Sequence, residues 1–245
     1  MADKPIIAFP ERFRHLLEPR LPDTVELRTF VGLDDALALA PETDIAWFDQ
    51  FEEGVMFKAP VLAAKAKWIN TTGVGIDAFD TDLIIERGQI FTNGVGLRSD
   101  GIADFAALGV LAMARHFDRV IRAHDRRDWI RAPEGSRELR GSRALILGYG
   151  SIGRAIGDRL RAFGVEVTGV RRSPDPASGV LGPDEWRARL GEFDWVVLAA
   201  PGTSETQHML GAAEFAAMKQ GAGIVNIARG VLIDQPAMVA ALESG

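Results

Sequence analysis

Short apolar segments alternate with segments of helical periodicity along most of the 245-residue chain. In the first part, strand-like segments are expected at Ile6–Phe9, Val25–Thr29, Ile45–Phe48, Trp68–Asn70 and Gln89–Thr92, with helical stretches at Phe13–Glu18, Asp34–Ala40 and Pro60–Lys65. A second series of strands is expected at Ala144–Leu147, Val165–Val170, Trp195–Ala199 and Gly223–Ile227. This alternation is typical of parallel sheets covered by helices, and it predicts an α/β protein.

One long helix is predicted between the two series, over residues 100–121. Apolar residues recur there at spacings of three and four, namely at Ile102, Phe105, Ala106, Gly109, Val110, Met113, Ala114, Phe117, Val120 and Ile121. Ser99 or Asp100 is the expected N-cap. The apolar stripe is wider than one sheet requires, so we expect a second surface to cover part of it. The polar segment 125–140 is interpreted as a loop with Trp129 as an aromatic anchor.

Composition excludes several classes of function. The net charge is −6, with 47% apolar and 25% charged residues, so no overall basic field would gather nucleic acid or an acidic membrane surface. The absence of cysteine excludes disulfides, thiolate metal sites and a cysteine nucleophile, and no metal is expected. Met1–Pro5 lacks a signal-peptide pattern, and the apolar stretch Ile102–Ala114 is too short to span a membrane. We therefore expect a soluble, cytoplasmic protein.

The most specific motif is a glycine-rich turn between a strand and a helix. Gly148, Gly150 and Gly153 form G-x-G-x-x-G after the strand Ala144–Leu147 and before a helix at Arg154–Phe163. In this context the first glycine permits the tight turn and the second lets the backbone approach a pyrophosphate. The third lets helix and strand pack closely, while the helix N-terminus attracts the anion. The motif predicts a Rossmann-type dinucleotide-binding unit that begins near Arg143.

The end of the second strand of this unit indicates which dinucleotide is bound. A unit selective for NAD usually has an acidic residue there to hold the ribose 2′-hydroxyl. This chain has Arg171, Arg172 and Ser173 instead, and guanidinium groups suit a 2′-phosphate. A solvated arginine pair is the ordinary alternative. We expect NADP, with NAD as the alternative cofactor.

Three segments together resemble the D-2-hydroxyacid dehydrogenase family, which includes glyoxylate and hydroxypyruvate reductases and phosphoglycerate dehydrogenases. They are Asn70–Asp77, the glycine-rich turn and Asn226–Asp234. The resemblance implies a smaller, flavodoxin-like α/β substrate-binding domain over residues 1–98. It also implies a dinucleotide-binding domain with a doubly wound parallel sheet over 99–245, including the linking helix 100–121. Substrate would lie in the cleft between the domains, and the family relationship and the apolar stripe together predict a homodimer through the linking helix.

The resemblance also assigns roles to residues. Arg229 matches the catalytic arginine that binds the carboxylate of a 2-oxo acid and polarises its carbonyl. Val74 and Gly75 match the loop whose N–H groups bind that carboxylate. Ser151 and Ile152 match pyrophosphate contacts. Further cofactor contacts are expected from Val74, Ala200, Pro201, Ile227, Ala228 and Arg229.

Two departures from the family pattern affect the expected activity. The family has a glutamate and an acid–base histidine downstream of the arginine, whereas this sequence ends at Gly245. The four histidines, His15, His116, His124 and His208, are not in matching contexts. Ala103-Asp104-Phe105 also stands where many relatives have Ala-Glu-His. The last strands and the return helix would be missing too, so we expect a shortened chain with little activity.

The expected function of the parent protein is reduction of a small 2-oxo acid to the D-2-hydroxy acid with NADPH. The alternative is a non-catalytic, dinucleotide-sensing protein, similar to the corepressors related to this family.

Overall fold

The computed structural model describes residues 4–174 and 179–245, which fold into two compact units. Unit 1 is Met1–Leu97 and unit 2 is Arg98–Gly245. The first three residues of the N-terminal segment considered for a signal peptide lie outside the described residues. No helix of the described part is long and apolar enough to cross a membrane.

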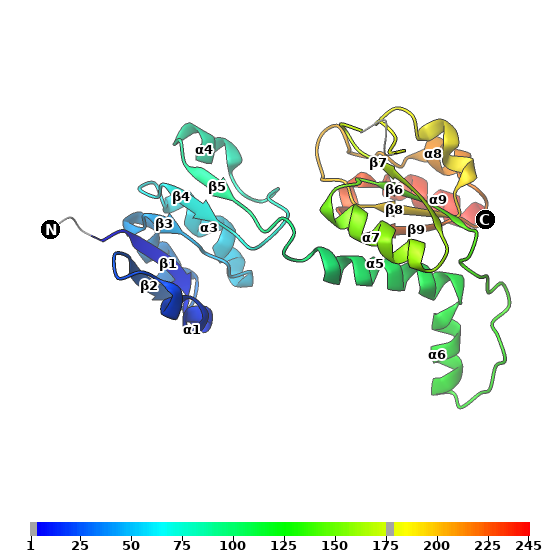
Figure 1. The fold of residues 1–245 in the computed structure, drawn as a ribbon, viewed down its shortest axis with the longest axis horizontal. Helices are drawn as coiled ribbons and strands as arrows, with labels where there is room; N and C mark the ends of the chain where they lie inside the picture. The colour runs from blue at the N-terminus through cyan, green and yellow to red at the C-terminus, as the bar shows by residue number, and fades with distance from the viewer. Residues whose placement is uncertain (1–3, 175–178) are drawn as a thin grey trace. The chain divides into compact units, whose positions relative to one another are not determined.

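Unit 1 contains a five-stranded parallel sheet in the order β2-β1-β3-β4-β5 (Figure 1). Its strands are β1 (Ile6–Pro10), β2 (Glu26–Phe30), β3 (Ile45–Ala46), β4 (Trp68–Asn70) and β5 (Ile90–Thr92). Its helices are α1 (Arg14–Leu17), α2 (Leu33–Leu39), α3 (Val55–Leu62) and α4 (Thr81–Glu86). All five residues of β1 are buried, as expected for an apolar strand with neighbours on both sides.

Two elements of unit 1 differ from the prediction. The strand expected at Ile45–Phe48 ends at Ala46, although the Trp47 N–H still donates to the Ala8 carbonyl. The helix expected at Pro60–Lys65 is displaced towards the N-terminus, where α3 begins at Val55. It begins there because Gly54 precedes it with φ 72°, a backbone conformation that glycine adopts readily.

Unit 2 contains a four-stranded parallel sheet in the order β7-β6-β8-β9 (Figure 1). Its strands are β6 (Arg143–Leu147), β7 (Glu166–Val170), β8 (Trp195–Leu198) and β9 (Gly223–Asn226). Its helices are α5 (Ser99–Ala114), α6 (Phe117–Asp125), α7 (Ser151–Ala162), α8 (Ala212–Ala217) and α9 (Gln235–Ser244).

Both faces of this sheet are covered, so it is doubly wound. Ala144 and Ile146 of β6 pack in a core with α5 and α7. Leu145 and Leu147 point to the opposite face, because side chains alternate along a strand, and pack in a second core with Trp186. The α/β fold class is confirmed, with parallel sheets in both units.

The prediction of a single linking helix over 100–121 is wrong. This region consists of two helices, because α5 ends at Ala114 and His116 has φ 45°, outside the helical region. The Ala114 carbonyl, which would accept from residue 118 in a continuing helix, accepts instead from the N–H of Arg137 at 2.8 Å. The loop after α6 therefore supplies the hydrogen bond that ends α5.

Three details of this region also differ from the prediction. The N-cap position of α5 is Arg98, without a side-chain hydrogen bond, and Ser99 is already helical with a buried hydroxyl that has no partner among the described residues. Phe105, placed on the apolar face, is 71% exposed, because Ala103, Ala106 and Ala107 form the buried face. Trp129 is 92% exposed and anchors nothing within the described structure.

Candidate functional site

The glycine-rich turn joins β6 to α7, and two of its glycines are required by close contacts. Gly148 has φ 101°, and a side-chain carbon there would lie 2.4 Å from the backbone nitrogen of Ala200. A side-chain carbon at Gly153 would lie 2.2 Å from the Gly148 carbonyl oxygen. Any other residue at either position would therefore collide with backbone.

Gly150 differs from the other two glycines of the turn. It is the N-cap of α7, has φ −84°, and a side-chain carbon there would have nothing within 4 Å. Among the described residues no side chain caps this 12-residue helix, so the N–H groups of its first turn, at Ser151 and Ile152, are available for an anion. An open approach at a helix N-terminus fits the pyrophosphate of a dinucleotide.

The loops that follow β6, β8 and β9 contact one another. Gly148 lies against the backbone of Ala199 and Ala200, at the end of β8. Gly202, two residues further on, packs closely against Arg229, since a side-chain carbon at position 202 would lie 3.1 Å from Cγ of Arg229. The structure thus brings the glycine turn, the Ala200–Pro201 turn and Arg229 together at the carboxyl edge of the sheet. This edge includes the point between β6 and β8 where strand order reverses, the usual ligand position in such sheets.

Arg229 is exposed and follows β9 in a turn held by Asn226. The Asn226 Oδ1 accepts from the N–H of Ala228 at 2.9 Å, and its Nδ2 donates to the Arg229 carbonyl at 2.8 Å. The N–H of Ile227 donates to the Leu198 carbonyl at 3.1 Å, which continues the contact with β8. The Arg229 Nη1 donates to the Ala228 carbonyl at 2.9 Å. The sequence motif contains Asn226, but its role as the clamp of this turn was not predicted.

Arg171, Arg172 and Ser173 are exposed and directly follow β7. The backbone N–H of Arg171 donates to the Leu181 carbonyl at 3.1 Å, which fixes the start of this segment. The Arg172 Nη2 lies 2.9 Å from Oε2 of Glu205, a residue of the turn after β8. This acidic partner was not predicted, because Glu205 is 33 positions away in the sequence.

Val74 and Gly75 belong to unit 1, in the loop after β4. Asp49, which follows β3, accepts at Oδ1 from the hydroxyl of Thr71 at 2.7 Å and at Oδ2 from the N–H of Thr72 at 2.6 Å. On the other side of the loop, Asn93 Nδ2 donates to the Val74 carbonyl at 2.9 Å. The N–H groups of Val74 and Gly75 donate no hydrogen bond within the described part of the chain. The loop is therefore held by hydrogen bonds on both sides, and it presents these two donors.

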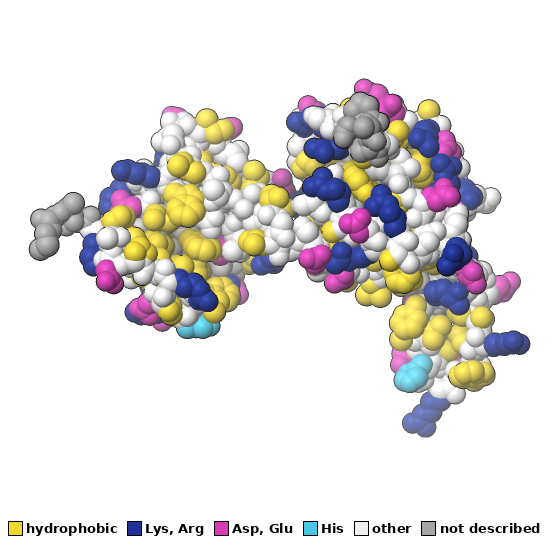
Figure 2. Space-filling model, viewed as in Figure 1, with side chains coloured by type: hydrophobic (Ala, Val, Ile, Leu, Met, Phe, Trp, Pro, Cys, Tyr) yellow, Lys and Arg dark blue, Asp and Glu magenta, His cyan; other side chains and the backbone are white. Residues whose placement is uncertain are grey.

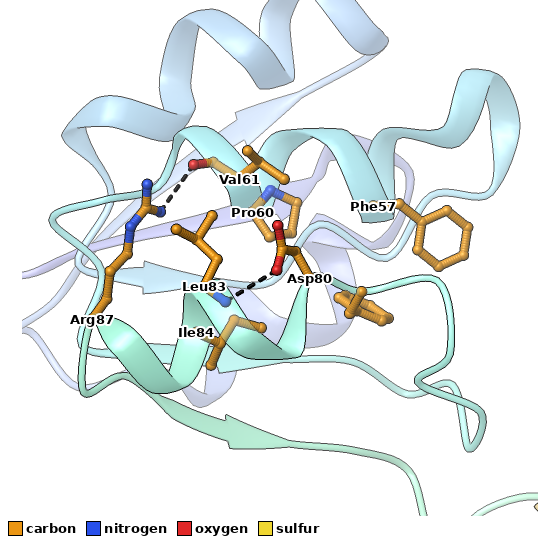
Figure 3. Close-up of a pocket in the computed structure, with 8 residues that line it drawn as sticks. Phe57, Pro60, Val61, Asp80, Leu83, Ile84 and Arg87 are labelled. Atoms are coloured by element: carbon orange, nitrogen blue, oxygen red, sulfur yellow. Dashed lines mark hydrogen bonds between the residues drawn. The ribbon is translucent and has the colours of Figure 1, made fainter. Parts of the chain in front are cut away.

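One cavity in unit 1 and one groove in unit 2 lie away from the candidate site residues. In unit 1 a cavity of about 10 Å³ lies between α3 and α4, closed on one side by Arg87, whose Nη1 donates to the Val61 carbonyl (Figure 3). A volume of this size corresponds to about one water molecule, so it does not fit an organic acid. In unit 2 an apolar groove of about 620 Å³ lies beside β9, between α8 and α9.

The histidines and acidic residues form no metal site in the described ranges, where no group of three or more metal-binding side chains is found. His15, His124 and His208 are exposed, and His116 lies at the break between α5 and α6. Asp104, at the position where the family resemblance implies a glutamate, pairs with Arg159 of α7, as does Asp100 at 2.9 Å. Asp104, which departs from the expected family pattern, therefore forms an ion pair within this chain.

Comparison with known proteins identifies the family. Residues 107–245 match the family model of the D-isomer specific 2-hydroxyacid dehydrogenase NAD-binding domain. A glyoxylate reductase from Thermococcus kodakarensis is 33% identical over 245 residues, which cover 93% of this chain and 68% of the relative. A D-3-phosphoglycerate dehydrogenase from Methanocaldococcus jannaschii is 33% identical over 75% of this chain and 36% of the relative.

Solved structures agree with the sequence comparison. The crystal structure of a glyoxylate reductase from Paecilomyes thermophila has a TM-score of 0.83 and 26% identity, covering 100% of this chain and 79% of that one. The chain spans 36% to 61% of the length of the first curated relatives it matches. Because the family model covers more than half of the chain, the protein belongs to the D-isomer specific 2-hydroxyacid dehydrogenase family.

Proposed function

We propose that this chain carries the dinucleotide-binding and substrate-binding elements of an oxidoreductase that acts on a small 2-oxo acid and its D-2-hydroxy acid. The observation that carries the proposal is the carboxyl edge of the unit 2 sheet. There Gly148 of the glycine turn lies against Ala199 and Ala200, and Gly202 of the same loop lies against Arg229. The names of the relatives, which include glyoxylate reductases and a D-lactate dehydrogenase, support the substrate class.

Each predicted site residue has a proposed task. Ser151 and Ile152 bind the pyrophosphate through their N–H groups, while Ala200, Pro201, Ile227 and Ala228 line the dinucleotide. The bound nicotinamide supplies the hydride. Val74 and Gly75 donate N–H groups to the substrate carboxylate, and Val74 is also proposed as a cofactor contact. Arg229 binds the carboxylate and stabilises the negative charge that develops on the carbonyl oxygen.

We further propose that the preferred dinucleotide is NADP(H), with NAD(H) bound more weakly. Arg171, Arg172 and Ser173 lie exposed after β7, where the adenosine ribose binds in this type of fold. Two guanidinium groups offer planar donors to a 2′-phosphate. Fluorescence titration with NADPH and NADH, on the unmutated protein and on Arg171→Asp, tests this preference. Equal affinities in the unmutated protein would contradict it.

The assembly proposed for this protein is a homodimer through the α5–α6 region. Exposed apolar side chains gather there, and Figure 2 shows hydrophobic groups on the surface over α6. They include Phe105, Leu108, Phe117, Ile121 and Trp129, which are between 46% and 92% exposed. A patch of this kind is unusual on a monomer, which supports a second copy as its partner.

Replacement of Arg229 tests the proposed substrate site. Arg229→Gln should weaken binding of oxamate, a 2-oxo acid analogue, about 10- to 100-fold in the presence of NADPH, since charge-assisted hydrogen bonds are lost. The affinity for NADPH itself should change little. Arg189→Gln, which removes an exposed arginine paired with Glu192, is the control.

Two outcomes separate the alternatives. Oxamate binding that survives Arg229→Gln would remove Arg229 from the substrate site. Tight NADPH binding without turnover of glyoxylate or hydroxypyruvate would favour the dinucleotide-sensing function.

A further inference from the structure

The arginine segment after β7 has an acidic partner that comes from another loop. Arg172 Nη2 and Glu205 Oε2 are 2.9 Å apart, and both side chains are more than two-thirds exposed. Glu205 lies in the turn that follows Pro201, next to the residues proposed to line the dinucleotide. The ion pair thus joins the ends of β7 and β8 at the edge of the sheet where the dinucleotide is proposed to bind.

The backbone that carries Glu205 is fixed by its neighbour Thr206. The Thr206 hydroxyl donates to the Pro201 carbonyl at 2.6 Å and accepts from the N–H of Thr203 at 2.8 Å. The N–H of Thr206 also donates to the Thr203 carbonyl at 3.1 Å. Because this turn is closed on itself, the backbone that carries Glu205 is held at a position from which the carboxylate reaches Arg172.

A carboxylate in this position affects the two dinucleotides differently. A 2′-phosphate would compete with Glu205 for the same guanidinium N–H groups and would be repelled by its charge. A ribose 2′-hydroxyl carries no charge and meets no such repulsion. Glu205 therefore opposes the selectivity that Arg171 and Arg172 create.

We propose that Glu205 is a specificity-determining residue for the dinucleotide, an inference that rests on the proposed function. Through its ion pair with Arg172 it lowers the affinity for NADP(H) and leaves the affinity for NAD(H) almost unchanged. The ratio of the two affinities is then set by the pair of residues, rather than by the arginines alone.

The experiment measures binding, so it does not depend on turnover. NADPH and NADH are titrated by fluorescence and by calorimetry against the unmutated protein and Glu205→Gln, which keeps the shape of the side chain and removes its charge. Glu205→Gln should bind NADPH about three- to tenfold more tightly, with NADH affinity changed less than about twofold. The gain should shrink at high salt, because the two groups are exposed.

Glu192→Gln is a matched control. Glu192 pairs with Arg143 at 2.8 Å, and Arg143 is the first residue of β6, at the opposite edge of the same sheet. This control also removes one carboxylate charge, together with the ion pairs of Glu192 with Arg143 and Arg189, and it should leave both affinities as they are.

The outcomes are distinct. If Glu205→Gln changed the affinities for NADPH and NADH by the same factor, so that their ratio stayed the same, the inference would be overturned while the proposed function would stand. Failure of the unmutated protein to bind either dinucleotide would overturn the proposed function, and this inference with it.

Discussion

Gly148 and Gly150 lie two residues apart, but only Gly148 is required by the fold. The backbone of Gly148 has φ 101°, and the nearby Ala200 leaves no room for a side chain. At Gly150 the backbone is ordinary and the space is open. The need for glycine at position 150 thus has no cause in the packing of the described residues, which supports a close approach by a ligand.

Gly150→Ala should separate folding from dinucleotide binding. We expect the free energy of unfolding to fall by only about 0.5–1 kcal/mol, since alanine is a poorer N-cap residue than glycine. The affinity for NADPH should fall at least about tenfold, because a methyl group would stand in the path of the pyrophosphate. Thermal unfolding and fluorescence titration measure the two effects.

Gly101→Ala is the control for Gly150→Ala. Gly101 is an exposed residue of α5 with nothing near its missing side chain, so alanine should stabilise the protein by about 0.5–1 kcal/mol without affecting binding. Unchanged NADPH affinity in Gly150→Ala would mean that the turn does not contact the pyrophosphate.

At the scale of single residues, local motifs in the sequence identify candidate site residues, whereas the contacts that hold these residues in place could not be predicted. The glycine spacing and Arg229 could be predicted because each belongs to a local motif. Asp49, Asn226 and Glu205 could not be assigned roles. Their functions depend on contacts between separate loops, and Asp49 is 22 positions from the Thr71 hydroxyl that it binds.

At the scale of elements, the two units share one arrangement at the start of the third strand, where an aspartate accepts a hydrogen bond from the first strand. Asp44 precedes β3 and accepts from the N–H of Ile6, the first residue of β1. Asp194 precedes β8 and accepts from the N–H of Arg143, the first residue of β6. A lysine pairs with each aspartate, Lys65 in unit 1 and Lys219 in unit 2. The sequence showed no internal repeat, yet the contacts repeat.

Asp194 should contribute to stability in a pH-dependent way. Its burial raises the pKa of its carboxyl, but the hydrogen bonds from Lys219 and from the N–H of Arg143 outweigh burial, so this pKa lies below its ordinary value. A lowered pKa means that the stabilisation is fully present above the unfolded-state pKa of about 3.9 and is lost as pH falls through the folded-state value.

Asp194→Asn should therefore lower the free energy of unfolding at neutral pH by about 1–2 kcal/mol and make it less dependent on pH below about pH 4. Denaturant unfolding of the two proteins between pH 3 and 7 measures both effects. Asp158→Asn, which removes an exposed partner of Arg161, should change stability little. A constant difference between Asp194→Asn and the unmutated protein at every pH would contradict the argument.

The break between α5 and α6 shows why one element was predicted wrongly. The apolar spacing continues through it, so periodicity alone gives one helix. At the break the Ala114 carbonyl accepts from the N–H of Arg137, 23 positions away, and no pattern within the helix reveals that contact.

At the scale of the whole molecule, the order of elements could be predicted from the periodicity, whereas the order of strands was implied only by the family resemblance. Alternating strands and helices require parallel pairing with crossovers, and both sheets are parallel. In each sheet the first strand lies between the second and the third. That arrangement depends on which side of the sheet each crossover takes, which the individual segments do not encode.

The proposed dimer can be tested by introducing one negative charge into α6, with the substitution Phe117→Glu. Phe117 begins α6, and the helix and the loop after it extend away from the sheet of unit 2 (Figure 1). Phe117→Glu should convert a dimer at micromolar concentration to a monomer, because the buried carboxylate would lack a partner at the interface. Light scattering or sedimentation equilibrium gives the mass.

Ile85→Glu provides the comparison for this test. Ile85 is a 75% exposed residue of α4 in unit 1, outside the proposed interface, and its replacement should leave the dimer intact. A monomeric mass for the unmutated protein would overturn the proposal, as would a dimeric mass for Phe117→Glu.

The glycine turn also contains the chain's single tyrosine, Tyr149. Its ring lies against Gly169 of β7, where a side-chain carbon would come within 2.3 Å of the ring, and its hydroxyl accepts from Arg161 Nη2 at 2.7 Å. A ring held in this way has restricted rotation. Isotope labelling of tyrosine would consequently give one spin system in the NMR spectrum, located between two glycines of the nucleotide turn. The protein thus has a built-in spectroscopic reporter, which could follow occupancy of this turn without any mutation.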